Sequence, residues 1–402
     1  STDTVINEEI AASMKQEENN DLLVQNLNAL WKNYCINSTY EPGSTMKPFG
    51  LLGAAQEGVN FNTIFNGNSG LTFETTPGTT AQVPNALNTN WGYINLYQAT
   101  ANSVNTVFME VNKHLGAANL AKIAHQAGIE EDIAEDTTYN ILGINGITVW
   151  DLAQGHSTIA NDGVKNTLHI VDTVLTSDGS KELYKTAQEN QQVFDANDCH
   201  LVQKAMQGTT TYGTAAGVSA RLGRQVAGKS GTANDEKAAS FVGYTPQLLN
   251  VWAIWNPAED GSAQEVPSFA GYGVSSTGYP SHLFEEFMSL ALQNQEVLTF
   301  TEPTDNGKIG GPDGTWGTGA QKTETRQNQE MPKVEENTEQ TTPDPTQNSD
   351  QNSGGNGDGG NSGDGGDGGD SGNNGGDSSG DGGNGGNSSG DNSGDDQSNG
   401  AQ

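Results

Sequence analysis

Three short polar clusters constrain this chain more than any other feature of its sequence. A serine hydroxyl is a weak nucleophile at its own pKa and needs a positioned base, and on a helix the residue three positions later lies on the same face. Ser44 and Lys47 have that spacing, which predicts a serine nucleophile activated by a lysine. The clusters are, in order, Ser44-Thr45-Met46-Lys47, Ser103-Val104-Asn105 and Lys229-Ser230-Gly231-Thr232.

The two ends of the 402-residue chain differ in composition from its middle. From Pro345 to Gly400 there is no hydrophobic residue. Such a segment cannot bury enough apolar surface to offset the cost of ordering it, about 1–2 kcal/mol per residue for the backbone alone. We therefore expect a disordered Gly/Asn/Ser/Asp-rich tail over 301–402. An N-terminal helical and acidic segment is expected over 1–39, which leaves one folded domain over 40–300.

The charge of the chain argues against a nucleic-acid partner. The formal net charge is −33, and residues 1–300 still hold 31 acidic and 13 basic side chains, a net of −18. Nucleic-acid binding requires a cluster of Lys and Arg that this composition lacks. A solvated acidic surface on a secreted or cell-surface protein is the interpretation we favour.

Neither the cysteines nor the histidines follow a metal-binding pattern. Cys35 and Cys199 are far apart in sequence, and the six histidines are scattered. We expect isolated, buried or half-buried thiols, with a disulfide as the alternative, and neither a metal nor another cofactor. No run of eighteen apolar residues occurs, so membrane attachment is expected only through a segment absent from this chain.

Hydrophobic periodicity predicts an α+β fold, with helices early and strands late. Residues 60–90 are polar and rich in turns, and Ser177-Asp178-Gly179 predicts a hairpin within 164–194. The predicted helices cover 44–55, parts of 91–128, 149–160, 196–206 and 281–293, and the predicted strands cover 225–232, 239–245 and 248–255.

The second and third clusters suit a loop and a strand, respectively. Side chains two apart on a regular helix diverge by about 200°, so Ser103 and Asn105 fit a loop between helices better. On a strand, alternation places Ser230 and Thr232 on one face, and Gly231 allows another backbone to approach closely.

Four longer phrases resemble the transpeptidase domain of penicillin-binding proteins, in the penicillin-binding and serine β-lactamase-like family. The resemblance covers about 40–257 and implies an antiparallel sheet flanked by helices, plus a helical subdomain. It is closer to the class A, bifunctional kind. We expect a fragment without the glycosyltransferase or dimerisation module, the membrane anchor and the early strands of the sheet. The phrases occupy residues 40–49, 101–108, 226–233 and 241–246.

The resemblance implies a D,D-transpeptidase that cross-links peptidoglycan stem peptides. Ser44 would attack the carbonyl between two terminal D-alanines, form an acyl-enzyme and release D-alanine. The implied helpers are Lys47 as base, Ser103 as proton relay, Asn105 as substrate and lysine contact, Lys229, Ser230, Gly231 and Thr232 as the binding site for the terminal carboxylate, and the N–H groups of Ser44 and Thr232 as oxyanion hole.

Other activities on the same site remain open at this stage. The family resemblance implies a target of β-lactam antibiotics at the outer face of the bacterial cytoplasmic membrane or in the cell wall. A D,D-carboxypeptidase and a non-catalytic β-lactam-binding sensor are alternatives. A class A β-lactamase is disfavoured, since no glutamate between Asn105 and Lys229 has an asparagine four residues later to complete the deacylating Glu-x-x-x-Asn segment.

Overall fold

The structure, a computed structural model, describes residues 33–187, 190–233, 236–257, 263–264, 266 and 278–318. These residues all fall in one compact unit, residues 1–333. The expected N-terminal helix lies almost entirely outside the described residues, and so does the expected tail beyond residue 318.

An antiparallel sheet forms one layer of the unit, with the strand order β11-β12-β13-β14. Lys229 pairs with Val242, and Phe241 with Trp252, in register. Among the described strands β11 is therefore at an edge of this sheet. The strands are β11 Ala227–Thr232, β12 Ala238–Tyr244, β13 Leu249–Pro257 and β14 Ala263–Gln264, within two residues of the predicted bounds for the first three.

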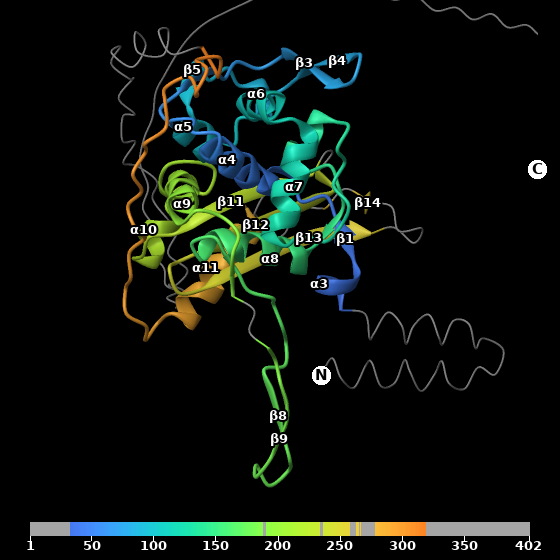
Figure 1. Ribbon diagram of the computed structural model, residues 1–402, viewed down its shortest axis with the longest axis vertical. Coiled ribbons are helices and arrows are strands. Elements are labelled where there is room, and N and C mark those ends of the chain that lie inside the picture. Colours follow the sequence, from blue (N-terminus) through green and yellow to red (C-terminus); the bar gives the residue numbers. More distant parts are fainter. Residues whose placement is uncertain are drawn as a thin grey trace, which may run out of the picture. The chain divides into compact units, whose positions relative to one another are not determined.

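Helices cover the sheet and form a second, mostly helical region beside it (Figure 1). α9 contacts β11, α8 contacts β13, and α11 contacts β12 and β13. The expected α+β class is confirmed. The helices are α3 Tyr34–Asn37, α4 Lys47–Gln56, α5 Leu96–Ala101, α6 Asn105–Leu115, α7 Ala117–Ala127, α8 Val149–Ala160, α9 Ala196–Thr211, α10 Val218–Leu222 and α11 Tyr279–Ala291, with 3₁₀ turns η1 Gly43–Met46, η2 Ala86–Asn88 and η3 Thr138–Leu142.

The turn-rich stretch 60–90 contains strands that the sequence did not predict. β3 and β4 form a hairpin, and β2 pairs with β5. Their burial pattern alternates only in part, which is why periodicity missed them. The remaining short strands are β1 Thr39–Tyr40 with β6 Ile147–Thr148, β2 Ile64–Asn66 with β5 Tyr93–Asn95, β3 Leu71–Thr76 with β4 Thr79–Val83, and β7 Val164–Lys165 with β10 Gln191–Gln192.

The predicted hairpin around Ser177-Asp178-Gly179 is present as β8 Thr173–Leu175 and β9 Glu182–Lys185. Every residue of both strands is exposed. Figure 1 shows the hairpin extending away from the body of the domain.

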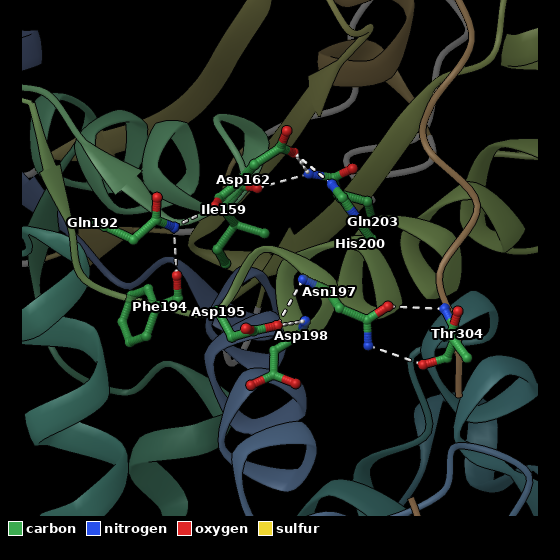
Figure 2. Close-up of polar contacts among 10 residues, drawn as sticks. All are labelled: Ile159, Asp162, Gln192, Phe194, Asp195, Asn197, Asp198, His200, Gln203 and Thr304. Atoms are coloured by element: carbon green, nitrogen blue, oxygen red, sulfur yellow. Dashed lines mark hydrogen bonds and ion pairs between the residues drawn. The ribbon is translucent and has the colours of Figure 1, made fainter. Parts of the chain in front are cut away.

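The expected start of the tail at residue 301 is wrong by at least 18 residues. Phe300 and Trp316 are buried, and Lys308 forms a β-bridge with Val59. Asn197 at the start of α9 donates to Thr304 O (2.9 Å) and accepts from Thr304 N–H (2.8 Å; Figure 2). Composition alone missed this segment because its few apolar side chains bury against elements far away in sequence.

Both cysteines are free thiols, so the disulfide alternative is not realised. Cys199 is buried as expected, whereas Cys35 is exposed, because it lies on the short α3 helix, none of whose residues is buried. Within the described part of the chain, no helix combines the length and apolar character needed to cross a membrane.

Candidate active site

The first cluster forms a 3₁₀ turn that continues into α4. The N–H of Lys47 bonds to Ser44 O, and Pro48 stands in the first turn of α4, where its missing N–H costs least. The predicted helix start at Ser44 is therefore a tighter turn. In a 3₁₀ turn side chains at i and i+3 eclipse, so Ser44 and Lys47 share a face. Ser44 itself is half-buried.

Two glycines allow this turn to lie directly against β11. Gly43 has φ +59°, and a β carbon there would clash with the backbone of Thr232. A β carbon on Gly231 would clash with Pro42 O. Gly231 is thus explained by contact with this chain's own backbone. This contact brings Ser44 beside the end of the third cluster.

Lys47 reaches from the turn to the second cluster. Its ammonium donates to Ser103 O (2.7 Å), Ser103 Oγ (3.2 Å) and Asn105 Oδ1 (2.8 Å). Ser103 lies between α5 and α6 with φ +56°, and Asn105 is the first residue of α6. The predicted loop is present at Ser103 and Val104, whereas Asn105 already belongs to α6. The left-handed backbone at Ser103 accompanies the contacts of both its carbonyl and its hydroxyl with Lys47.

Lys229 reaches the same hydroxyl from the sheet. Its Nζ donates to Ser103 Oγ (2.9 Å) and to Ser230 O (3.0 Å). Ser230 is 2% exposed and its hydroxyl lies 2.7 Å from Thr214 Oγ1, whereas Thr232 is exposed. The structure therefore brings together side chains from all three predicted clusters.

Both lysines are 0% exposed, and in the described residues neither has a carboxylate within ion-pair distance. Burial lowers the pKa of Lys47 well below its ordinary value, and the nearby charge of Lys229 lowers it further. Burial lowers the pKa of Lys229 to about 7. An amine that is neutral near neutral pH can act as a general base.

The geometry at Ser103 suits proton transfer. A hydroxyl has two lone pairs and one hydrogen, and both lone pairs face ammonium groups here. Its hydrogen is then left for a third partner. If Lys47 is neutral, the same contact reverses and Ser103 donates to Nζ. The hydroxyl can therefore pass a proton between an amine and a reacting group.

His156, on α8, supports the turn that holds Ser44. Its Nε2 lies 2.9 Å from Thr45 O, and a carbonyl only accepts, so Nε2 carries the hydrogen. Burial lowers the pKa of His156 to about 4. The neutral ring packs edge-on against the ring of Phe49, and the two ring centroids are 5.2 Å apart. An isolated histidine gives no sequence signal for this contact, which joins residues 111 positions apart.

Thr214 is a second contact that the sequence left open. The stretch 208–214 predicts either a family loop or a plain turn, and the structure continues α9 through Thr211. The N–H of Thr214 then donates to Ala101 O (2.9 Å). Together with its contact to Ser230, this ties the helix before the second cluster to the third. Among the described residues no group of His, Cys, Asp or Glu could hold a metal ion.

Comparison with known families identifies the domain. The family model described as "Penicillin binding protein transpeptidase domain" matches residues 4–272. The chain belongs to this family. The resemblance seen in the sequence is confirmed, and the four phrases that carry it lie within the matched span.

Curated relatives of this transpeptidase family point to the class A kind. Penicillin-binding protein 1A of Neisseria flavescens is 29% identical over 289 residues, which cover 69% of this chain and 35% of the relative. Penicillin-binding protein 1A of Mycolicibacterium smegmatis is 28% identical over 67% of this chain and 36% of the relative. The class A interpretation is confirmed, and the chain spans about a third of the length of these relatives.

Solved structures share the fold of this transpeptidase domain. PonA1 from Mycobacterium tuberculosis, in complex with penicillin V, is 25% identical with a TM-score of 0.56 and covers 71% of this chain and 76% of that one. Penicillin-binding protein 1A from Haemophilus influenzae aligns with a TM-score of 0.59 at 17% identity, over 67% of this chain and 45% of that one. The expected transpeptidase-like architecture is confirmed.

Proposed function

We propose that this domain is a D,D-transpeptidase that cross-links peptidoglycan stem peptides through an acyl-enzyme on Ser44. The observation that carries the proposal is the convergence of two fully buried lysines on Ser103 Oγ, directly beside the Ser44 turn. Burying two unpaired cations is costly. A site that needs one neutral amine and one anion-binding ammonium accounts for that cost.

The first half of the reaction forms the acyl-enzyme. Neutral Lys47 takes the proton of Ser44, whose Oγ bonds to the carbonyl carbon between the two terminal D-alanines. The N–H groups of Ser44 and Thr232 stabilise the oxyanion. The C–N bond then breaks. Ser103 passes its proton to the departing D-alanine amine and takes one from Lys47, which had received it from Ser44.

The second half transfers the acyl group. An amine of a neighbouring stem peptide bonds to the acyl carbon, loses a proton to the same relay, and displaces Ser44 Oγ, which regains its hydrogen. Lys229, Ser230 and Thr232 hold the carboxylate of the terminal D-alanine during the first half. The edge position of β11 allows the donor peptide to add as a further strand.

β-Lactams would acylate Ser44 in the same way. The structure of PonA1 in complex with penicillin V supports β-lactam binding by this domain. We assign the domain to the outer face of the bacterial cytoplasmic membrane or the cell wall. Its partners are stem peptides and β-lactams, and nucleic acid is not among them.

The test is acylation by a fluorescent penicillin followed by peptide mapping. We expect one persistent adduct on Ser44, none in Ser44→Ala, and an unchanged adduct in Ser289→Ala on α11. An adduct elsewhere would overturn the assignment. Product analysis with a D-Ala-D-Ala donor and an added amine separates the alternatives: amide product indicates transpeptidation, free acid a carboxypeptidase, and an adduct without turnover of the peptide a sensor.

A further inference from the structure

The segment 301–318 is firmly attached to the domain and has no role in the reaction described above. In Figure 1 it is drawn in orange and runs along one side of the domain toward β5. Asn60 N–H donates to Lys308 O (3.0 Å). Further along, Trp316 is 5% exposed and stacks on His114 of α6, with ring centroids 4.7 Å apart. The segment therefore holds its side chains in fixed places.

Asp305, within this segment, is a half-buried carboxylate without a cation. In the part of the chain that the structure describes, no Lys, Arg or His lies within ion-pair distance of it. Burial raises the pKa of its carboxyl, and the hydrogen bond from Phe61 N–H offsets only part of this rise. Removing a carboxylate from water without a cation is costly. In return, a carboxylate is a stronger acceptor than a neutral oxygen, so it fixes the groups that donate to it.

The groups that contact this carboxylate lead to the start of α5. Phe61 N–H donates to Asp305 Oδ2 (2.9 Å), and Tyr97 OH lies 3.5 Å from the same oxygen. Phe61 O in turn accepts from the N–H of Leu96, the first residue of α5 (3.0 Å). The rings of Phe61 and Tyr97 also pack together, with centroids 5.6 Å apart. Asp305 therefore fixes the first turn of α5.

The helix α5 is short and ends at the second cluster. It contains six residues, Leu96–Ala101, and the N–H of Ser103 donates to Thr100 O in its last turn (3.1 Å). With a rise of about 1.5 Å per residue, Tyr97 and Ala101 are only about 6 Å apart along the helix axis. A displacement of the first turn is therefore carried directly to Ser103, whose hydroxyl both buried lysines contact.

We propose that Asp305 is a positioning residue for acylation: from outside the site it holds α5, and through α5 it keeps the Ser103 hydroxyl within reach of both buried lysines. This inference rests on the proposed function. Ser103 Oγ lies 3.2 Å from Lys47 Nζ and 2.9 Å from Lys229 Nζ, so a small displacement of α5 lengthens one or both contacts. Proton transfer through Ser103 is then impaired. Binding of the donor is less affected, because Lys229 and Ser230 belong to the sheet.

The test separates the binding of benzylpenicillin from the acylation step, by rapid-quench kinetics at increasing penicillin concentration. We expect Asp305→Ala to slow the acylation step roughly 10-fold, since a misplacement of about 1 Å can cost about 100-fold, and to leave the dissociation constant of the non-covalent complex nearly unchanged. Asp305→Asn, whose amide oxygen can accept the same hydrogen bonds, should recover most of the lost rate. The matched control is Asp313→Ala. It removes an exposed aspartate of the same segment that accepts from Thr315, two residues later, and should acylate at the wild-type rate.

A purely structural role gives a different result. It would lower the melting temperature of Asp305→Ala but leave the acylation step of the folded protein at the wild-type rate, and this outcome would overturn the proposal. Equal slowing in Asp305→Ala and Asp305→Asn would also overturn it. If Asp305→Ala does not fold, Tyr97→Phe removes only the hydroxyl beside the carboxylate: a slower acylation step supports the proposal, and a wild-type rate overturns it. If the wild type is not acylated, the proposed function fails, whereas an acylated wild type with unchanged variants removes only the role of Asp305.

Discussion

Two polar clusters of this domain use similar groups in opposite ways. The lysine cluster consists of Lys47, Ser103, Asn105 and Lys229. The α9 cluster, shown in Figure 2, consists of Asp162, Asp195, Asn197, His200 and Gln203. In the lysine cluster both amines are fully buried and share one hydroxyl, and in the described residues neither meets a carboxylate.

The α9 cluster satisfies its charges locally. Asp195 accepts from two N–H groups in the first turn of α9, and Asp162 lies 3.0 Å from His200 Nε2 and accepts from Gln203 (3.2 Å). Carboxylates capped or paired in this way stabilise structure. The comparison shows what distinguishes the candidate catalytic site. It is the burial of amines without a carboxylate partner, and not the number of charged groups.

The largest expected effect is the loss of the base from the lysine cluster. Lys47→Met keeps a similar volume but removes the amine, so acylation by benzylpenicillin should slow by about 10²- to 10⁴-fold. The matched control is Lys204→Met. It removes an exposed lysine of α9 that forms an ion pair with Glu302. It should acylate at the wild-type rate. A Lys47→Met rate within tenfold of wild type would contradict the role of base.

The next effect is the pH dependence of stability. The folded pKa of Lys229, about 7, is below its ordinary value near 10.5, so the unfolded chain binds more protons between these values. The free energy of unfolding should therefore rise with pH across that window, by up to about 1.4 kcal/mol per pH unit for one group.

Urea unfolding at several pH values measures this slope. Lys229→Met should flatten it, both directly and because the charge that lowers the pKa of Lys47 is gone. Lys204→Met should retain the wild-type slope. Identical slopes in all three proteins would show that the buried lysine is not deprotonated on folding.

A smaller effect is expected when the histidine that supports the Gly43–Met46 turn is replaced. His156→Phe fills a similar volume and loses the buried hydrogen bond to Thr45 O, at a cost of about 1–2 kcal/mol in unfolding free energy. It should also slow acylation, because the turn that holds Ser44 is less firmly fixed. Since the folded pKa of about 4 is below 6.5, wild-type stability should fall as the pH is lowered from 6.5 to 4. An equally steep fall in His156→Phe would contradict this assignment.

The smallest effect is expected in the α9 cluster. Asp195→Ala removes the cap that accepts from Asn197 and Asp198 N–H, which should cost about 1 kcal/mol of unfolding free energy. Acylation should not change. A large loss of acylation with an intact fold would mean that the two clusters are coupled, and would break the contrast drawn here.

Much of the local structure around the candidate site could be predicted from the sequence, because it depends on short-range pattern. The Ser44 to Lys47 spacing, the loop at 103–105 and the strand at 227–232 each follow from short-range pattern, and the late strands fell within two residues of their predicted bounds. The strands within 60–95 and the docked segment 301–318 were missed, because their stability comes from pairing and burial against distant residues.

By itself, the sequence determined which groups are present and, for the strand that carries Lys229 and Ser230, the element on which they stand. Only the tertiary structure decided their electrostatics. The pKa values of Lys47 and Lys229 depend on burial and on the contacts that bring both to Ser103, across 56 and 126 residues of chain. The contact of His156 with Thr45 was likewise invisible in the sequence. Desolvation and close approach are properties of the folded environment, and no local pattern specifies them.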